Sequence, residues 1–233
     1  MMEINGIPEI KFQIDRIRQS KVESIVVATS VDPSDDVLAA YVESLGVEVR
    51  RGPLDDVAGR YKQILDEINP TNFLRLTADC PLTMPSLINE MIDRFSSEQL
   101  DYLSNANPPT FPDGLDVEIV KTSAFSRLVS KNLTILEREH VTLGFVSRES
   151  EFAMANHEYD VDLSQLRWTL DYQEDLEYIR KISQVLSGRE LTFTIADVMK
   201  VIEENPEIKN RLSGDNRNIG LKSASKISGV ENE

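Results

Sequence analysis

Helix-like and strand-like hydrophobic patterns alternate along the first third of the chain. Ile10, Ile14 and Ile17 recur at i, i+4 and i+7, which predicts an amphipathic helix over residues 8–20. Residues 24–29, Ser-Ile-Val-Val-Ala-Thr, are apolar at consecutive positions, as in a parallel strand that is covered on both faces. Strand and helix patterns keep alternating up to residue 81, which predicts a right-handed α/β layer whose mostly parallel sheet is sandwiched by helices.

The pattern changes in the second half of the chain. Residues 115–120, Leu-Asp-Val-Glu-Ile-Val, alternate apolar and acidic side chains, which favours an edge strand or a small antiparallel excursion. Beyond Pro206 the periodicity fades, so we expect one α/β domain over residues 1–205 and a polar, flexible tail over residues 206–233. The other predicted helices cover residues 32–45, 61–68, 87–95, 122–130, 136–147, 172–187 and 194–204, and the other predicted strands cover residues 47–49, 72–77, 101–104, 152–155 and 167–170.

Net charge indicates which partners the protein is unlikely to bind, and the cysteine content indicates which kind of metal site it can form. Forty acidic residues against 25 basic ones give a formal net charge of −15 at pH 7, which disfavours nucleic acid and anionic membranes as partners. No apolar run reaches the ~20 residues of a membrane span, and the first residues do not look like a signal peptide, so we expect a cytoplasmic protein. Cys80 is the only cysteine, so any metal ion must be held mainly by oxygen ligands.

Two carboxylates directly follow predicted strands. Asp79 comes after the strand over residues 72–77, and Asp171 comes after the strand over residues 167–170. In open α/β sheets ligands bind beyond the carboxyl ends of the strands. If the two strands are neighbours, the carboxylates converge into a pair of hard oxygen ligands of the kind that Mg²⁺ prefers. The spacing is equally compatible with two helix N-caps, and capping and metal binding do not exclude each other.

Six motifs follow one another in a single order along the chain. They are residues 25–30 (Ile-Val-Val-Ala-Thr-Ser) with Asp35 and Asp36, 56–61 (Asp-Val-Ala-Gly-Arg-Tyr), 75–82 (Arg-Leu-Thr-Ala-Asp-Cys-Pro-Leu), 114–118 (Gly-Leu-Asp-Val-Glu), 137–142 (Glu-Arg-Glu-His-Val-Thr) and 167–176 (Arg-Trp-Thr-Leu-Asp-Tyr-Gln-Glu-Asp-Leu). From residue 2 to residue 210 the chain thereby resembles the spore coat polysaccharide cytidylyltransferase-like family, which is related to the acylneuraminate and 3-deoxy-manno-octulosonate cytidylyltransferases.

The resemblance implies a fold and an activity. The fold is the nucleotide-diphospho-sugar transferase fold shared with GT-A glycosyltransferases. The activity is transfer of CMP from CTP to a sugar or sugar acid for surface polysaccharide, with release of pyrophosphate. In the related enzymes, carboxylates that match Asp79 and Asp171 hold the Mg²⁺, so both residues are expected to be metal ligands and catalytic residues. The expected partners are CTP, a small sugar and a second copy of the chain in a homodimer.

The resemblance also suggests residues that bind the nucleotide. It places Arg60 toward the nucleotide, although an arginine in an amphipathic helix is often only solvated or salt-bridged. Thr29, Ser30 and Asp32 end the first predicted strand, where the base is expected, and a turn or cap role explains Asp32 equally well. Thr77, at the end of the strand before Asp79, completes the expected nucleotide site.

Three further residues are expected at the sugar pocket. The resemblance places Arg138 and His140 near it, although the same segment reads as an ordinary charged helix start, and a lone histidine is often structural. Asp116 and Glu118 share one side of their strand, because alternate strand residues face the same way. They either position sugar hydroxyls or lie on a solvated face, and we favour a substrate contact for Asp116.

One expected part of the family pattern is absent from this sequence. The family begins with a strand and a loop of the form Ile-Gln-Ala-Arg-x-x-Ser-x-Arg-Leu-Pro-Gly-Lys, whose amides and cations hold the triphosphate, whereas this sequence begins with the segment that follows the loop. We therefore expect an N-terminally truncated fold that binds CTP poorly. A late gene start, a fragment and a noncatalytic relative are all open explanations.

Two other functions remain open on the sequence. The shared fold permits a glycosyltransferase that uses a nucleotide sugar. It also permits a noncatalytic binding or assembly module. Release of pyrophosphate distinguishes a cytidylyltransferase from both.

Overall fold

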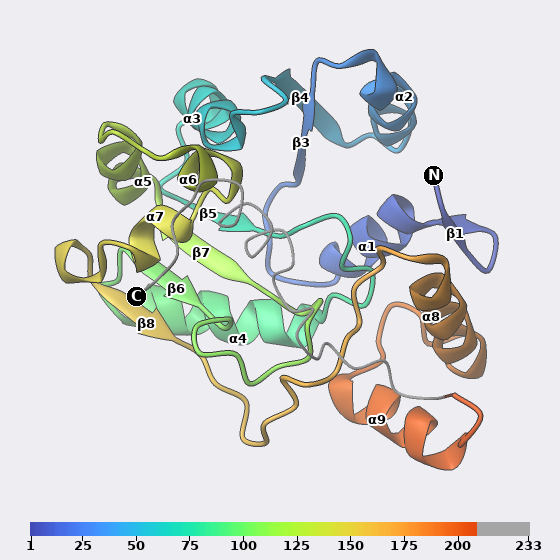
Figure 1. Cartoon of the computed structure of the whole chain (residues 1–233). Helices are drawn as coiled ribbons and strands as arrows, with labels where there is room; N and C mark the ends of the chain where they lie inside the picture. The colour runs from blue at the N-terminus through green and yellow to red at the C-terminus, as the bar shows by residue number, and fades with distance from the viewer. Residues whose placement is uncertain (209–233) are drawn as a thin grey trace.

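The computed structural model of the protein describes residues 1–208. Within them the strands form three sheets, which pair β1 (Glu3–Ile4) with β2 (Ile7–Pro8), pair β3 (Val26–Ser30) with β4 (Glu48–Gly52), and place the remaining strands in the order β5-β7-β6-β8 (Figure 1). The helices are α1 (Glu9–Ile17), η1 (Pro33–Asp35), α2 (Asp36–Ser44), α3 (Val57–Ile68), α4 (Pro85–Ser97), α5 (Thr122–Val129), α6 (Ile135–Glu139), α7 (Leu143–Val146), η2 (Glu149–Glu151), α8 (Gln173–Val185) and α9 (Ile195–Glu204).

The largest sheet has mixed strand directions. Its strands are β5 (Asn72–Arg75), β7 (Glu118–Lys121), β6 (Tyr102–Ser104) and β8 (Met154–Asn156). β7 runs antiparallel to both β5 and β6, whereas β6 and β8 are parallel. The antiparallel excursion predicted from the alternating pattern around β7 is thereby confirmed, although the strand itself begins only at Glu118.

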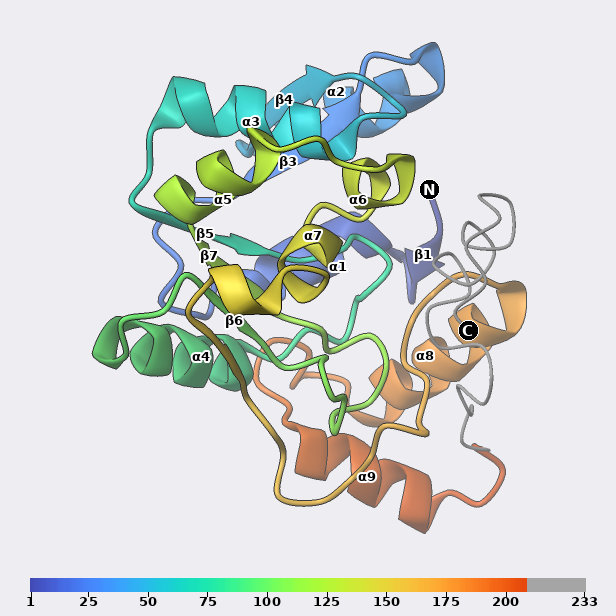
Figure 2. The same ribbon diagram turned by 60° about the vertical axis from the view of Figure 1, so that its left-hand side comes forward.

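Helices cover both faces of this sheet, which explains the consecutive apolar residues in its strands. Leu103 and Ile119 point to one face and pack in a core cluster with the apolar side of α4. Tyr102 and Val120, which neighbour Leu103 and Ile119 in their strands, point to the other face and pack with α3 and α5. Figure 2 shows α4 on one side of the sheet and α3, α5 and α7 on the other. The predicted α/β class with a sheet between helices is confirmed.

The β3–β4 pair is a compact unit of its own. The two strands are parallel and are joined through η1 and α2. Asp32 begins η1 by accepting a hydrogen bond from the Ser34 amide at 2.9 Å, as its position before Pro33 predicts. The inner side of α1 joins α2 and the following turn in a small core cluster of Ile10, Ile14, Val42 and Val47.

The sequence analysis missed one strand pair and predicted one strand that does not form. The hairpin of β1 and β2 turns at Asn5 and Gly6, whose φ angles of 51° and 84° are both left-handed, as in a type I′ turn. The Asn-Gly pair could have predicted it. The strand expected over residues 167–170 was wrong, because only Arg167 pairs there, in a single parallel bridge with Asp113. Polar contacts rather than a strand ladder fix this segment.

The helix predicted over residues 136–147 is also wrong, because it divides into α6 and α7. The break lies at Val141, which has a φ of 35° and is fully buried. A β-branched residue in the left-handed region costs about 1–3 kcal/mol, which the surrounding packing must offset. The break separates His140, at the end of α6, from Leu143, where α7 begins.

The chain closes the fold with α8 and α9, which contact each other at one end of the molecule (Figure 1). Ile208, the last described residue, is buried in the large core cluster. Residues 209–233, most of the predicted tail, lie outside the described part of the chain. No helix within residues 1–208 is long and apolar enough to cross a membrane.

Candidate functional site

Three loops from distant parts of the sequence are joined by backbone hydrogen bonds. The Leu170 amide donates to the Asp79 carbonyl oxygen at 2.9 Å. The Trp168 amide donates to the Asp113 carbonyl oxygen at 2.7 Å, and the Asp113 amide donates to Leu166 at 2.9 Å. The loop after β5, the loop before β7 and the segment before α8 therefore lie together. They carry Asp79, Asp116 and Asp171 respectively.

Gly114 makes this close approach possible. Its φ of +101° is accessible to few residues other than glycine. A Cβ atom at this position would lie 2.7 Å from the carbonyl carbon of Trp168 and 2.8 Å from the Thr169 amide nitrogen. The absence of a side chain thus lets the Gly-Leu-Asp-Val-Glu motif lie directly against the segment that ends at Asp171.

Asp79 and Asp171 face a third carboxylate, Glu9, at the start of α1. Burial, and then the negative charges of Asp79 and Asp171, raise the pKa of Glu9 to about 8. The Glu9 Oε1 atom is buried and has no hydrogen-bond partner. The region therefore combines acidic groups with an unsatisfied carboxyl oxygen, an arrangement that is unfavourable without a compensating positive charge.

Neither aspartate caps a helix. α8 has Tyr172 at its N-cap, and the Asp175 carboxylate accepts hydrogen bonds from the amides of Tyr172 and Asp171 at 3.0 and 3.1 Å. α4 begins after Met84, well beyond Asp79. The capping alternative that the sequence left open is therefore wrong for both carboxylates.

Asp171 is oriented by the buried guanidinium group of Arg167. Arg167 donates to Asp171, lies 3.3 Å from the Asp175 carboxylate and lies 3.6 Å from that of Asp113. Only 7% of the Arg167 side chain is exposed, against 45% for Asp171. The buried carboxylates of Asp113 and Asp175 thus hold Arg167 in place, while the Asp171 carboxylate remains accessible to solvent.

The oxygen atoms of Asp79 and Asp171 suit Mg²⁺, because this ion is often bound through one or two carboxylates and completes its shell with water and phosphate oxygens. The orphaned Glu9 oxygen lies beside them, and a bound cation would favour the ionised form of this carboxyl by lowering its raised pKa. No group of three or more His, Cys, Asp and Glu side chains within residues 1–208 could hold a metal ion. Mg²⁺ binding by Asp79 and Asp171 therefore stays a prediction.

The predicted base-binding residues form a closed local turn at the end of β3. The hydroxyl groups of Thr29 and Ser30 donate to the same Asp35 oxygen at 2.7 and 2.6 Å, and the Ser30 amide donates to it at 2.9 Å. These hydrogen bonds hold the pKa of Asp35 below its usual range. Asp32, as described above, caps η1. Nucleotide binding by Thr29, Ser30 and Asp32 stays a prediction.

Arg60 lies in the first turn of α3, and the side chain of Arg138 in α6 reaches the start of the same helix. Arg60 donates to the Pro53 carbonyl at 2.8 Å, while its buried Nε atom has no partner. Arg138 reaches across from α6 to the Asp56 carboxylate at 2.9 Å, and Asp56 in turn caps α3 through the Gly59 amide. The structure therefore brings together one residue predicted for the nucleotide and one predicted for the sugar.

His140 lies beside a buried polar cluster in the largest sheet. Arg75 and Tyr102 both donate to the Glu118 carboxylate, from the strands on either side of β7. Burial lowers the pKa of His140, and the positive charge of Arg75 lowers it further, against an opposing contribution from Glu139. The His140 Nε2 atom is buried without a partner. His140 is therefore a neutral imidazole with a buried nitrogen that has no partner.

Thr77 and Asp116 flank the only cysteine. The Thr77 hydroxyl lies 3.1 Å from the Cys80 sulfur, and the Thr77 carbonyl accepts a hydrogen bond from Gln13 at 2.8 Å. Burial raises the pKa of the Cys80 thiol, and the charges of Asp79 and Asp116 add to that effect. Asp116 is thus close to the loop that carries Asp79.

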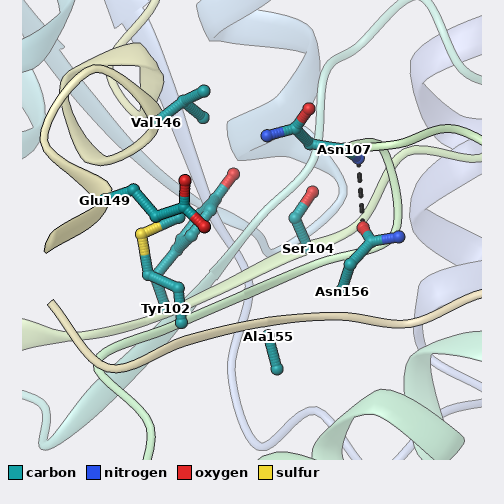
Figure 3. Close-up of a pocket in the computed structure, with 8 residues that line it drawn as sticks. Tyr102, Ser104, Asn107, Val146, Glu149, Ala155 and Asn156 are labelled. Atoms are coloured by element: carbon teal, nitrogen blue, oxygen red, sulfur yellow. Dashed lines mark hydrogen bonds between the residues drawn. The ribbon is translucent and has the colours of Figure 1, made fainter.

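A cavity of about 150 Å³ lies on the β6–β8 side of the sheet (Figure 3). Strands β6 and β8 form its floor, and residues of α7, η2 and the loop after β6 form its sides. Tyr102, part of the polar cluster with Arg75 and Glu118, belongs to its lining. The residues around it are Tyr102, Ser104, Asn107, Val146, Glu149, Met154, Ala155 and Asn156.

Comparison with known proteins identifies the family. A sequence model of the cytidylyltransferase family matches residues 1–199. The chain belongs to the cytidylyltransferase family. The spore coat polysaccharide biosynthesis protein SpsF of Bacillus subtilis (strain 168) is 26% identical over 213 residues, which cover 87% of this chain and 86% of that protein. The resemblance inferred from the six motifs is confirmed.

Solved cytidylyltransferase structures share the fold. A cytidylyltransferase from Leptospira borgpetersenii serovar Hardjo-bovis (strain JB197) superposes with a TM-score of 0.84 at 29% identity, covering 89% of this chain and 87% of that one. CMP:2-keto-3-deoxy-manno-octonic acid synthetase, solved with CTP, gives a TM-score of 0.60 at 12% identity, over 79% of this chain and 90% of that one. The second match shows likeness of fold alone.

The cytidylyltransferase motifs coincide with the loops that meet in the structure. Residues 75–82, 114–118 and 167–176 supply the three joined segments, and residues 56–61 and 137–142 meet through Arg138 and Asp56. Sequence reasoning missed Glu9, Arg167 and Asp175. Asp175 could have been recognised as a first-turn helix acid, but the contacts of Glu9 and Arg167 depend on segments that only the fold brings together.

Proposed function

We propose that the protein transfers CMP from CTP to a sugar hydroxyl and releases pyrophosphate. The observation that supports this proposal is the backbone hydrogen bond from Leu170 to Asp79, which joins the two segments that carry Asp79 and Asp171. Membership of the cytidylyltransferase family supports the donor. The similarity to SpsF, a spore coat polysaccharide biosynthesis protein, supports a sugar acceptor and a role in surface polysaccharide.

In the proposed reaction the acceptor hydroxyl oxygen forms a bond to the α-phosphorus of CTP. The bond between the α-phosphorus and the bridging oxygen breaks, pyrophosphate leaves with the electron pair, and the hydroxyl proton is released to water. Such a transfer depends mainly on positioning and on neutralisation of phosphate charge. Asp79 and Asp171 would hold Mg²⁺, which when bound supplies that neutralisation.

The other residues have positioning roles in this proposal. Arg167 fixes the carboxylate of Asp171, while Arg60 and Arg138 place positive charge at the start of α3. His140, neutral at pH 7 because its pKa is lowered, offers a nitrogen to a substrate hydroxyl. The homodimer and the cytoplasmic location stay predictions.

The test is pyrophosphate release from CTP and Mg²⁺ in the presence of candidate sugars. We expect Asp79→Asn and Asp171→Asn each to lose most of the rate, on the order of 100-fold or more, because each removes one charged ligand. Asp93→Asn is the matched control, since Asp93 is 62% exposed and pairs only with Lys21 on the surface of α4. Full activity in either site variant contradicts the proposed metal ligands. Release of a nucleoside diphosphate from a nucleotide sugar, without pyrophosphate, contradicts the proposed reaction.

A further inference from the structure

One side of α1 carries three polar residues that lie against the loop with Asp79. Glu9, Gln13 and Arg16 follow one another at i, i+4 and i+7, so they share one side of the helix. Gln13 is only 3% exposed, and Arg16 is fully buried. Burying a polar side chain costs free energy unless its hydrogen bonds are made. The partners of these side chains therefore indicate their role.

The side-chain amide of Gln13 holds the Asp79 loop at both ends. Its Nε2 atom donates to the Thr77 carbonyl oxygen at 2.8 Å and to the Thr83 hydroxyl oxygen at 3.2 Å. The Thr83 hydroxyl in turn donates to the Cys80 carbonyl oxygen at 2.7 Å. One side chain of a helix therefore fixes a residue before Asp79 and a residue after it.

Arg16 anchors the second end of the loop to the body of the protein. Its Nε atom donates to the Thr83 carbonyl oxygen at 2.7 Å, and an Nη2 hydrogen bond of 3.2 Å reaches the Phe193 carbonyl oxygen. The guanidinium carbon also lies 3.5 Å from the centre of the Phe193 ring. Arg16 thereby connects the loop to the segment between α8 and α9, whereas Gln13 also holds the Thr77 end.

The position of this loop sets the position of Asp79 relative to Asp171. The Asp79 carbonyl oxygen accepts a hydrogen bond from the Leu170 amide at 2.9 Å, which joins the loop to the segment that ends at Asp171. The Cys80 thiol donates to one Asp79 carboxylate oxygen at 3.4 Å. A shift of residues 77–83 would therefore move one aspartate away from the other. A misplacement of about 1 Å can cost roughly 100-fold in rate.

We propose that Gln13 is a positioning residue, which holds Asp79 where it and Asp171 bind one divalent cation together. This inference rests on the proposed function for the cation, whereas the loop contacts do not. Loops move more easily than the helices and strands that they join, and functional side chains are held in place by hydrogen bonds from the residues behind them. The neighbouring residues of α1, Phe12 and Ile14, are apolar and buried, so packing alone does not require an amide at this position.

Hydrogen exchange followed by NMR on the full chain tests the positioning without any metal ion. Gln13→Met keeps the length of the side chain but removes both donated hydrogen bonds. The amides of Leu170 and Thr83 bond to carbonyl oxygens inside the loop, so they should exchange about tenfold faster in the variant, as expected for a local loss of one hydrogen bond. The amides of β6 and β7 should keep their rates. Equal acceleration of all these amides, or no acceleration, overturns the inference.

Gln19→Met is the matched control for this exchange experiment. Gln19 lies just beyond the end of α1, is exposed and donates to the Asp15 carbonyl oxygen at 3.2 Å, within its own turn. The same chemical change at this position should leave the exchange of the Leu170 and Thr83 amides at the wild-type rate. A comparable acceleration in both variants would show that Gln13 has no special effect on the loop, and would overturn the inference.

Titration with Mn²⁺, followed by electron paramagnetic resonance, tests whether Gln13 acts through Asp79. Gln13→Met alone should weaken Mn²⁺ binding about tenfold, as is typical for residues that orient metal ligands. In the Asp79→Asn background the same substitution should weaken binding no further, because the ligand that it positions is already altered. For a wild-type chain that binds Mn²⁺, the same loss in both backgrounds, or no loss in either, overturns the inference.

The two measurements separate this inference from the proposed function. If the wild-type chain binds no Mn²⁺ while Gln13→Met accelerates exchange only in the loop, the proposed metal ligands are contradicted, and the role of Gln13 in placing Asp79 is supported. If Asp79→Asn weakens Mn²⁺ binding but Gln13→Met changes neither exchange nor affinity, only this inference is contradicted.

Discussion

The turn at the end of β3 and the acidic site around Asp79 are built in opposite ways. In the turn, Thr29 and Ser30 donate three hydrogen bonds to one oxygen of the Asp35 carboxylate, from residues no more than six positions away. In the acidic site, Glu9, Asp79 and Asp171 come from three distant segments, and a buried Glu9 oxygen has no partner. The first arrangement favours the folded state by itself. The second leaves a buried carboxyl oxygen without a partner, and such unfavourable arrangements are typical of functional sites.

The largest expected effect comes from separating the loops that build the acidic site. Gly114→Ala places a Cβ 2.7 Å from the Trp168 backbone at a φ of +101°, so it should lower the free energy of unfolding by about 3 kcal/mol. Urea unfolding followed by circular dichroism measures the change. Gly188→Ala is the control, because its φ is +80° but no atom lies within 4 Å of the added Cβ. Its cost should be only about 1 kcal/mol. Equal costs in the two variants would refute the role of close packing at Gly114.

The next expected effect concerns the turn at the end of β3. Asp35→Ala removes an acceptor shared by three donors and should cost about 2 kcal/mol of unfolding free energy. Asp36→Ala, at an exposed surface pair with Arg51, should cost less than about 1 kcal/mol.

The contribution of Asp35 should also depend on pH in a defined direction. Its pKa is lower in the folded protein than the ordinary 3.8, so its stabilisation is fully present above that value and is lost as the pH falls through the folded pKa. Urea unfolding of the wild type and of Asp35→Ala at pH 6 and pH 3 measures this. A gap between the two proteins that widens on acidification would be inconsistent with an ionised Asp35 as the acceptor.

The smallest expected effect concerns Glu9 in the acidic site. Glu9→Gln replaces a buried carboxyl beside Asp79 and Asp171 whose pKa is raised to about 8, so that about half of it is ionised at pH 8. At that pH and without divalent cations the variant should therefore stabilise the fold by about 1 kcal/mol. The thermal midpoint measures it, with Glu3→Gln in the exposed hairpin as the control. Destabilisation of the Glu9 variant, with Glu3→Gln unchanged, would show that Glu9 has a favourable partner.

The sequence predicted those features that depend on neighbouring residues. The apolar spacing of Ile10 and Ile14 predicted α1, the Asp32-Pro33 pair predicted the start of the next helical segment, and the alternation around Val117 predicted an antiparallel strand. The ends of strands also indicated Asp79 and Asp171, and the structure brings their loops together.

What the sequence could not predict depends on contacts across the fold. Arg167-Trp168 reads as a strand, but Arg167 is held by Asp113 and Asp175, and only one bridge forms. Glu9 reads as an ordinary first-turn acid, and nothing in its own segment indicates the two aspartates beside it. The sharp bend at Val141 is likewise invisible in the pattern, because the packing that offsets its strain comes from elsewhere in the core.

In the proposed site, Asp79 and Asp171 bind one divalent cation together. A double-mutant cycle of Asp79→Asn, Asp171→Asn and the double variant, titrated with Mn²⁺ by electron paramagnetic resonance, tests whether they share it. Each single variant should weaken Mn²⁺ binding about tenfold or more, and the double variant should bind little worse than the singles, because the two ligands share one ion. Independent, fully additive losses, or wild-type affinity in either single variant, would contradict a shared site.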